Sequence, residues 1–506
     1  MDWWKLEGPD RRRFGALAAG GLLYVLPILL ADRYYQDDLA RSLYGATGWA
    51  GDGRPMTEWI MQLLAGGEVT IANLTPLPML LGLAALAYGL TIYAKQAFPA
   101  LRNSWAATLA LGLVLVHPFA MANLSYQFDC LTMVLALALC FVLYALPAGW
   151  GGLRLALAGA VDALLVMNLY QPASGMFVVL AAIWLAFWLV DWLGSGEAVK
   201  KRLPSLWVEV WRLGGVAVGA LVYLLAVAPR FVDTEGWRQE ASQTVGGAGT
   251  VTTVVTNILS GAYYIRERMR MTPPLYRVVL VVTVVGAVVT ALWHFWRQSA
   301  ASPLRKAAGM VVLVGAPFGM LLASYLPLVA LQNMECSARM FLPYGGTMLF
   351  IGLVWLWALP KRRVVAGFLM GACLFCQTCY LYAYGNALKS QKDYEVYLVT
   401  RIAADCEILN GAGNYHQLSF AGTAPRPQEV QRICGQYPFF GELIQPCFTN
   451  STWLGGAWVY HYLQYDLEIV GLTEADAAAC TGENLLRQNA RYACYQSGEK
   501  IVVSFR

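Results

Sequence analysis

The sequence predicts a mainly α-helical protein that crosses a membrane many times. Of its 506 residues, 58% are hydrophobic and only 13% are charged, whereas a soluble globular chain carries about 25% charged residues. The mean hydropathy is +0.49, and apolar runs long enough to cross a bilayer recur along most of the chain. This composition excludes a soluble enzyme, a nucleic-acid-binding protein, a disordered regulator and a collagen-like rod.

The apolar runs predict about eleven transmembrane helices. The first run, 14–31, follows three consecutive arginines, so we expect it to be an uncleaved signal anchor with the N-terminus in the cytoplasm. The ten further candidates lie at about 75–95, 103–122, 128–146, 154–170, 173–193, 208–228, 274–295, 307–326, 342–359 and 364–384. Prolines and glycines interrupt several of them, which membrane helices tolerate when neighbours satisfy the backbone.

The distribution of charge supports this topology. Every short loop expected on the inner side is basic, as the positive-inside rule requires. The residues concerned are Lys95, Arg102, Arg154, Lys200, Lys201, Arg202, Arg297, Arg305, Lys306, Lys361, Arg362 and Arg363. Residues 385–506, which an odd number of spans places outside, carry 9 basic and 12 acidic residues, against 27 and 19 in residues 1–384. We therefore expect a transmembrane catalytic domain over 1–384 and a periplasmic domain over 385–506.

The C-terminal segment is expected to form a small α/β domain. Helices are predicted at 394–409 and 427–434, a strand at 415–420, and a terminal hairpin from 491–496 and 500–505. Six of the eleven cysteines lie in segments expected to face outside, where disulfides can form. These are Cys336, Cys406, Cys434, Cys447, Cys480 and Cys494. The pairs Cys434–Cys447 and Cys480–Cys494 are plausible, but spacing alone leaves the connectivity open.

The first outer loop carries the strongest functional signal. It runs DRYYQDDLARSLYGATGWAGDGRPMTEWIMQLL from Asp32, with the adjacent carboxylates Asp37 and Asp38 at the membrane surface. Two amphipathic segments, 39–44 and 56–64, are too short to span and should lie in the interface. The aspartates could cap the first segment or supply a general base beside the lipid headgroups. The two roles are compatible.

Three further groups of polar residues lie at the expected outer ends of spans. They are Asn123, Ser125, Tyr126, Gln127 and Asp129; Asn168, Tyr170 and Gln171; and Gln332, Asn333, Glu335, Ser337 and Arg339. Each group could be a solvated turn, but their shared side indicates one polar cavity that opens outward. Outward arginines in 229–272 indicate an anionic ligand such as a lipid phosphate. Three of these, Arg266, Arg268 and Arg270, could equally hold lipid headgroups.

Motifs for nucleotide and zinc chemistry are missing from the sequence. It contains no HExxH, P-loop, GxSxG or Rossmann fingerprint. We therefore expect no required cofactor and no resident metal. The carboxylate pair could hold a divalent cation, although no second ligand cluster is evident.

These features resemble the type II O-antigen glucosyltransferases, the Gtr serotype-converting enzymes. The resemblance is carried by YYQDDLARSLYGATGW, GRPMTEWIMQLL, TPLPMLL, NLYQPASGMF at 168–177, and the tail with its YHQLSFAG strand and terminal hairpin. It covers nearly the whole chain, and the first loop is its specific part. It implies a GT-C-like fold, in which a polytopic glycosyltransferase carries an acidic motif in its first outer loop.

The resemblance also implies a reaction and its partners. A glucosyl or other hexosyl residue would pass from undecaprenyl-phosphate-sugar to lipopolysaccharide O antigen, on the periplasmic face of the bacterial inner membrane. The reaction would be a direct displacement in which Asp37 or Asp38 deprotonates the acceptor. The residues expected to bind the donor phosphate or sugar are Arg54, Arg339, Tyr35, Gln171, Asp129 and Glu335. Functional association with the flippase and the enzyme that make the lipid donor is implied as well.

Other function classes remain open at this point. Another polyprenyl-phosphate-sugar-dependent transferase would act on lipid A, another lipid or protein. An O-antigen ligase or polymerase also uses outward arginines, but those enzymes lack a strong early acidic motif. A transporter commonly shows repeated halves, and we find no internal repeat.

Overall fold

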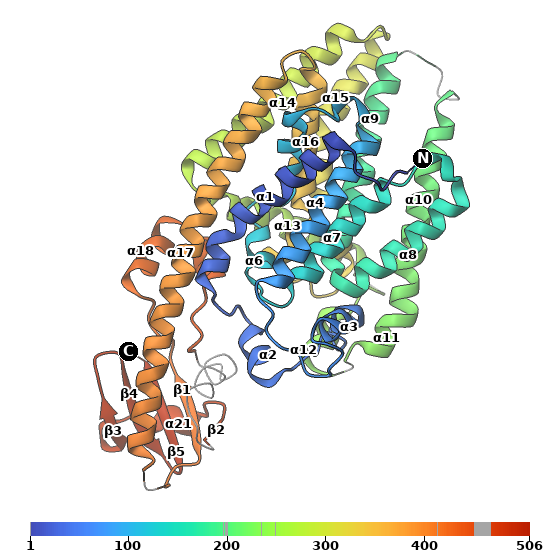
Figure 1. Ribbon diagram of the computed structural model, residues 1–506. Coiled ribbons are helices and arrows are strands. Elements are labelled where there is room, and N and C mark those ends of the chain that lie inside the picture. Colours follow the sequence, from blue (N-terminus) through green and yellow to red (C-terminus); the bar gives the residue numbers. More distant parts are fainter. Residues whose placement is uncertain are drawn as a thin grey trace.

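The computed structural model describes residues 2–505 except 196, 198–200, 234, 248, 412 and 450–466. Long helices form a bundle, and a small sheet lies beyond one end of it (Figure 1). The helices of the bundle are α1 (Gly8–Ala31), α4 (Leu77–Ala97), α5 (Trp105–Gly112), α6 (Ala120–Ser125), α7 (Cys130–Tyr144), α8 (Gly152–Tyr170), α9 (Gly175–Ser195), α10 (Leu203–Val222), α11 (Ala228–Phe231), α13 (Thr250–Arg270), α14 (Pro274–Gln298), α15 (Pro303–Ala323), α16 (Tyr344–Ala358) and α17 (Arg363–Leu409).

The predicted polytopic helical fold is confirmed. Within the described residues, eight segments are long and apolar enough to cross a membrane, one of which, Gly152–Ser195, contains both α8 and α9. Helices α7 and α16 are apolar all round and are buried on nearly every face. Helices such as α14 and α15 instead expose valine, leucine and phenylalanine side chains on their outer surface, where lipid would cover them.

The predicted count of eleven spans remains unconfirmed because two of the apolar runs form short helices. The run 103–122 forms α5, of eight residues, and the start of α6, separated by a turn. Pro118 has no backbone N–H, and its ring disfavours a helical conformation at His117, which favours the break here, whereas α1 and α15 continue through Pro27 and Pro317. Helix α7 has 15 residues, fewer than the roughly 20 that span the hydrocarbon core.

Helix α17 joins two elements that were predicted separately. It has 47 residues and continues from the last predicted span into the predicted helix at 394–409. The predicted domain boundary at residue 384 therefore lies inside one unbroken helix. Figure 1 shows α17 running from the helix bundle to the sheet.

The C-terminal segment forms the predicted small α/β unit. Its five strands are β1 (Gln417–Ala421), β2 (Glu468–Ile469), β3 (Leu485–Gln488), β4 (Tyr492–Ser497) and β5 (Lys500–Phe505), in the order β2-β1-β5-β4-β3. β1 is parallel to β2 and β5, while β3, β4 and β5 are antiparallel, which includes the predicted terminal hairpin. The helices of this segment are α18 (Gln428–Gln436), α19 (Phe440–Leu443) and α21 (Glu474–Ala479).

Neither predicted short-range disulfide is present. Cys434, Cys480 and Cys494 are free thiols. Cys494 lies on β4 in the core of the C-terminal unit, together with Cys406. The Cys480 thiol, at the end of α21, instead donates to the carbonyl of Asp476, 3.4 Å away. The sheet therefore directs Cys494 inward, away from the cysteine nearest to it in sequence.

A buried ion pair fastens the C-terminal unit to the bundle. Arg33, which follows α1, donates from Nε and Nη2 to the two Glu395 carboxylate oxygens on α17, at 3.1 and 3.0 Å. The two side chains are only 4% and 1% exposed. Arg33 also donates to the Gln445 carbonyl at 2.6 Å, and Glu395 accepts from the Cys447 backbone N–H at 3.0 Å. Removal of one partner of such a pair costs about 3–5 kcal/mol.

The contact between α1 and α17 depends on a glycine and generates a test. A Cβ added to Gly385 would lie 2.5 Å from the Pro27 Cβ and 2.7 Å from its carbonyl carbon, which is backbone and cannot turn aside. We expect Gly385→Ala to lower the free energy of unfolding by about 1–3 kcal/mol through overpacking. Gly371→Ala, on the same helix but with open space around it, is the matched control. Equal thermal unfolding of both variants in detergent would contradict this helix contact.

Candidate active site

The first outer loop folds into the two short helices that its sequence predicts. These are α2 (Asp38–Tyr44) and α3 (Pro55–Leu64), and they lie with α12 (Gly236–Ser242) at one end of the bundle (Figure 1). On α3, Trp59 and Leu63 are exposed while Met61 is buried. The exposed apolar face suits a helix that lies in the membrane interface.

Asp38 is buried and organises the loop. Its Oδ2 accepts hydrogen bonds from the backbone N–H groups of Tyr35 and Gln127 at 3.0 and 2.8 Å, and its Oδ1 accepts one from Phe128 at 3.3 Å. The residue is 0% exposed, and burial raises the pKa of its carboxyl well above the usual value. Asp38 thus joins the loop to the turn between α6 and α7.

Asp37 is the accessible carboxylate of the pair. Its side chain is 33% exposed, and its Oδ2 forms an ion pair with Nη2 of Arg41 at 3.0 Å. It stands at the N-cap position of α2, but its side chain accepts no capping hydrogen bond. The cap considered from sequence is therefore not formed by Asp37, and its carboxylate remains partly open to solvent.

Arg339 faces the same region from another part of the chain. It lies on the short helix η7 (Ala338–Phe341), and its Nη1 donates to the Tyr126 hydroxyl at 2.9 Å. The Tyr126 ring packs edge-on against Tyr35, with centroids 4.9 Å apart. Asp37 and Glu335 are both close enough to act electrostatically on the Arg339 guanidinium. Among the described residues, Arg339 forms no ion pair with a carboxylate, so its charge is available to a ligand.

Asp129 and Arg54 belong to a neighbouring buried network. Asp129 Oδ1 accepts hydrogen bonds from Trp49 Nε1 at 2.7 Å and Arg54 Nη1 at 3.2 Å. Arg54 Nη2 also pairs with Asp52 at 3.0 Å. Two carboxylates thus already surround the Arg54 guanidinium, which leaves it less available for a phosphate than Arg339.

Gln171 supports the backbone of the loop. Its Nε2 donates to the Asp52 carbonyl at 3.0 Å and to the Tyr223 hydroxyl at 2.8 Å. The Tyr223 hydroxyl in turn donates to the Gly53 carbonyl at 2.9 Å. Gly53 has a φ of +73°, and a Cβ there would collide with that hydroxyl. The loop therefore requires a glycine at position 53.

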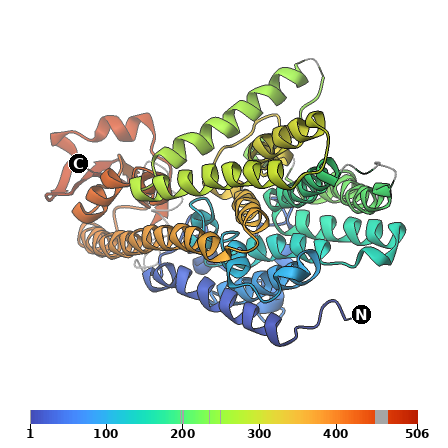
Figure 2. The same ribbon diagram turned by 90° about the horizontal axis from the view of Figure 1, so that it is seen from above.

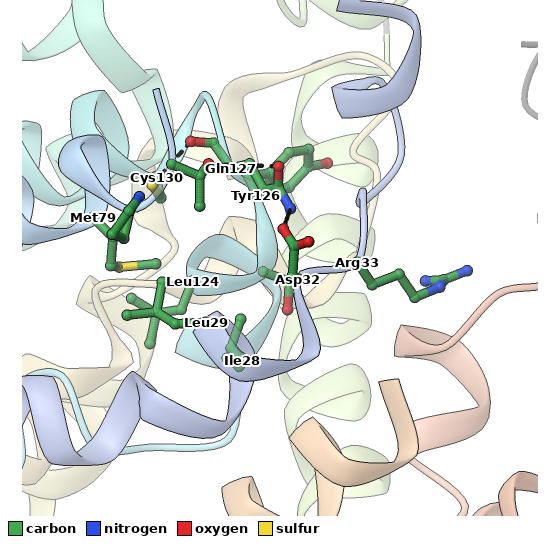
Figure 3. A pocket seen from close by; sticks show the side chains of 12 residues that line it. Ile28, Leu29, Asp32, Arg33, Met79, Leu124, Tyr126, Gln127 and Cys130 are labelled. Atoms are coloured by element: carbon green, nitrogen blue, oxygen red, sulfur yellow. Dashed lines mark hydrogen bonds between the residues drawn. The ribbon is translucent and has the colours of Figure 1, made fainter. Parts of the chain in front are cut away.

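A small pocket lies beside this region, between the end of α1 and the turn at 124–130 (Figure 3). Figure 3 shows apolar side chains on one side, namely Ile28, Leu29, Met79 and Leu124. On the polar side, Gln127 donates to Asp32 at 3.2 Å. The side chain of Arg33 points away from the pocket, toward the C-terminal segment.

Sequence reasoning missed the residues that connect the site. Arg41, Trp49 and Asp52 all take part in the networks around Asp37 and Asp129. Arg41 lies four residues after Asp37, in a predicted helix, and this spacing brings opposite charges together. The ion pair between them could therefore have been predicted from the sequence. Trp49 reaches Asp129 through a tertiary contact that no local spacing predicts, and the same holds for the contact between Asp52 and Arg238. Within the described residues, no cluster of three His, Cys, Asp or Glu side chains is placed to hold a metal ion.

Comparison with known families identifies the family to which the chain belongs. The model of the family described as glucosyl transferase GtrII matches residues 26–354. The chain belongs to this family. It is a glycosyltransferase, and the matched residues include the first outer loop, the turn at 125–129 and Arg339.

A phage protein is similar over most of the GtrII-family chain. This relative, named as an uncharacterized 55.3 kDa protein in the gtrB 5' region of Salmonella phage P22, is 23% identical over 453 residues, which are 89% of this chain and 90% of the relative. No solved structure matches the GtrII-family chain.

The different environments of the two aspartates generate a prediction. Asp38→Ala leaves three buried N–H groups without an acceptor, so we expect the free energy of unfolding to fall by about 3 kcal/mol or more. Asp37→Ala removes a carboxylate that is one-third exposed, and the buried Arg41 keeps Asp129 as a counter-charge at 3.6 Å, so we expect a smaller loss, of about 1 kcal/mol. Thermal unfolding of the detergent-solubilised protein measures both. An equal loss of stability in the two variants would contradict the different roles.

Proposed function

We propose that this GtrII-family chain transfers a glucosyl residue from undecaprenyl phosphate to lipopolysaccharide O antigen, at the periplasmic face of the inner membrane. Family membership supports glucosyl transfer. The carrier and the acceptor are supported by the resemblance to the serotype-converting enzymes. The phage relative, which is named for its place beside gtrB, agrees with this assignment.

The arrangement of the bundle supports an outward-facing site. The loops after α14 and α16 lie at the end of the bundle opposite α2 and α3 (Figure 1). Arg305 and Lys306, in the first turn of α15, and Arg362, just before α17, follow these loops. If the basic end is cytoplasmic, then α2, α3 and the C-terminal sheet lie on the periplasmic side. The N-terminus, with its three arginines, would then be cytoplasmic and the C-terminus periplasmic.

The observation that carries the proposal is that the accessible Asp37 lies within electrostatic range of Arg339, which forms no ion pair with any carboxylate of the described residues. In the proposed reaction, Asp37 takes the proton of the acceptor hydroxyl. The acceptor oxygen then attacks the anomeric carbon, and the bond to the phosphate oxygen breaks with its electron pair left on the phosphate. Arg339 donates hydrogen bonds to the phosphate oxygens and stabilises the charge that develops there.

The remaining predicted residues have supporting roles in this proposal. Tyr35 packs edge-on against Tyr126, whose hydroxyl accepts a hydrogen bond from Arg339, and so supports the position of Arg339. Asp38, Gln171, Asp129 and Arg54 hold the loop in place rather than contact the donor. Glu335, which is exposed in the loop before η7, stands where it can meet a sugar hydroxyl.

We expect Asp37→Asn to lower glucosyl transfer by about 10²–10⁴-fold, the usual contribution of a general base. The assay follows labelled glucose from its polyprenyl phosphate to O antigen in membranes with and without the protein. Asp393→Asn is the matched control, because Asp393 is an exposed carboxylate on α17 paired only with Lys389. Full activity of Asp37→Asn would end the base assignment, and transfer of a different sugar would end the glucose assignment.

We expect Arg339→Gln to lower the rate by about 10²-fold through loss of charge at the leaving phosphate, and Arg339→Lys to keep part of it. Arg297→Gln, which changes an exposed arginine in the last turn of α14, should leave the rate unchanged. Steady-state rates at saturating acceptor measure all three. A rate for Arg339→Gln equal to that of the control would exclude Arg339 from phosphate binding.

A further inference from the structure

We propose that Arg41 is a positioning residue that orients the Asp37 carboxylate, and that Asp129 becomes its counter-charge when Asp37 takes up the proton. This inference rests on the proposed function, in which Asp37 is the base. It concerns Arg41, which the sequence did not single out, and it gives Asp129 a role other than donor binding.

The Arg41 guanidinium is held on several sides. Its side chain is 6% exposed. Nη1 donates to the Thr47 carbonyl, and the guanidinium carbon lies 3.9 Å from the centre of the Trp49 ring, a cation–π distance. Nη2 pairs with Asp37 at 3.0 Å. Because Thr47 and Trp49 fix the guanidinium independently of Asp37, the ion pair orients the carboxylate.

Asp129, which lies beside Nε of Arg41, is also fixed. Its Oδ1 accepts from Trp49 Nε1 and Arg54 Nη1. Trp49 therefore contacts both partners, since its ring packs on Arg41 while its N–H binds Asp129. The charge alternation continues from Arg54 to Asp52, and from Asp52 to Arg238, at 3.0 and 2.7 Å.

Two unpaired atoms face each other between Arg41 and Asp129. Arg41 Nε and Asp129 Oδ2 are both buried and lack a hydrogen-bond partner. They lie 3.6 Å apart, which is within ion-pair range but longer than the 2.7–3.2 Å of a hydrogen bond. Buried polar atoms are almost always paired. A small shift of the guanidinium toward Asp129 would satisfy both atoms and weaken the contact with Asp37.

The proposed reaction creates the need for such a shift. When the acceptor proton moves to Asp37, that carboxylate becomes neutral and Arg41 loses its closest negative charge in a buried site. An unpaired buried charge is strongly unfavourable. Asp129, already facing Arg41, supplies the replacement, so proton transfer leaves no uncompensated charge. No oxidant, reductant or further reactant is required.

The test uses the full chain in membranes and compares Arg41→Gln, Arg41→Lys and Asp129→Asn with Asp37→Asn. We expect Arg41→Gln to lower kcat by about tenfold or more, as a misplaced base would, while the KM values for donor and acceptor stay within about twofold. Arg41→Lys should recover part of kcat because it keeps the charge. Asp129→Asn should lower kcat in the native chain but add little to Arg41→Gln, since coupled residues are not additive. Arg297→Gln controls for loss of a surface charge.

The outcomes separate this inference from the proposed function. If Arg41→Gln keeps the native kcat while Asp37→Asn is inactive, the positioning role of Arg41 is overturned. The assignment of Asp37 as the base is then unaffected. Activity of Asp37→Asn overturns the base itself. If Arg41→Gln and Arg41→Lys have equal kcat and both have lowered thermal stability, Arg41 serves only the stability of the fold. That result overturns the inference. If Arg41→Gln does not fold, the other two variants provide the test. A native kcat in both Arg41→Lys and Asp129→Asn then overturns the inference.

Discussion

The geometry of the outer face depends on one buried carboxylate, that of Asp38. Two of its three backbone hydrogen bonds attach the loop after α1 to the turn between α6 and α7, about ninety residues later in the sequence, and the third, from Tyr35, lies within the loop. Neighbouring residues of an α-helix point about 100° apart. Once Asp38 is directed into the protein at the start of α2, Asp37 must point elsewhere, and it does so toward Arg41 and solvent. The same carboxylate that gives the loop its stability thus leaves its neighbour available for chemistry.

The C-terminal unit packs against this face through several buried contacts. Arg33 and Glu395 form an ion pair that is almost completely buried. Phe440 of α19 stacks on Tyr380 of α17, with ring centroids 4.5 Å apart. Glu442, next to this aromatic contact, accepts hydrogen bonds from Tyr264 and Arg268. Arg268 was considered from sequence as a lipid-headgroup residue, but in the structure its charge is matched by Glu442. The segment around α19 therefore closes one side of the region that contains the proposed site.

The sequence was most informative where a pattern is local. The apolar runs, the two short helices of the first loop and the terminal hairpin each follow from residue spacing over fewer than about 25 residues, and the structure contains them. The run 103–122 was misread because apolar composition identifies burial, while Pro118 and its effect on His117 decide whether a helix can continue. The paired cysteines were misread for a related reason: a short loop brings two cysteines close in sequence, but the facing of β4 directs Cys494 into the core.

By itself the sequence determined that the chain is a polytopic helical protein with an acidic loop after its first apolar helix and a small C-terminal α/β unit. Hydrophobicity, charge and helical period act over short distances along the chain, and so they can be read from it directly. Only the tertiary structure decided which aspartate is buried, which arginine keeps an unmatched charge, and which residues lie between them. Asp37 and Arg339 are about three hundred residues apart, and the backbone groups at 127 and 128 that bind Asp38 come about ninety residues after it. Burial and ion pairing depend on those distant contacts, and no single segment of the chain contains them.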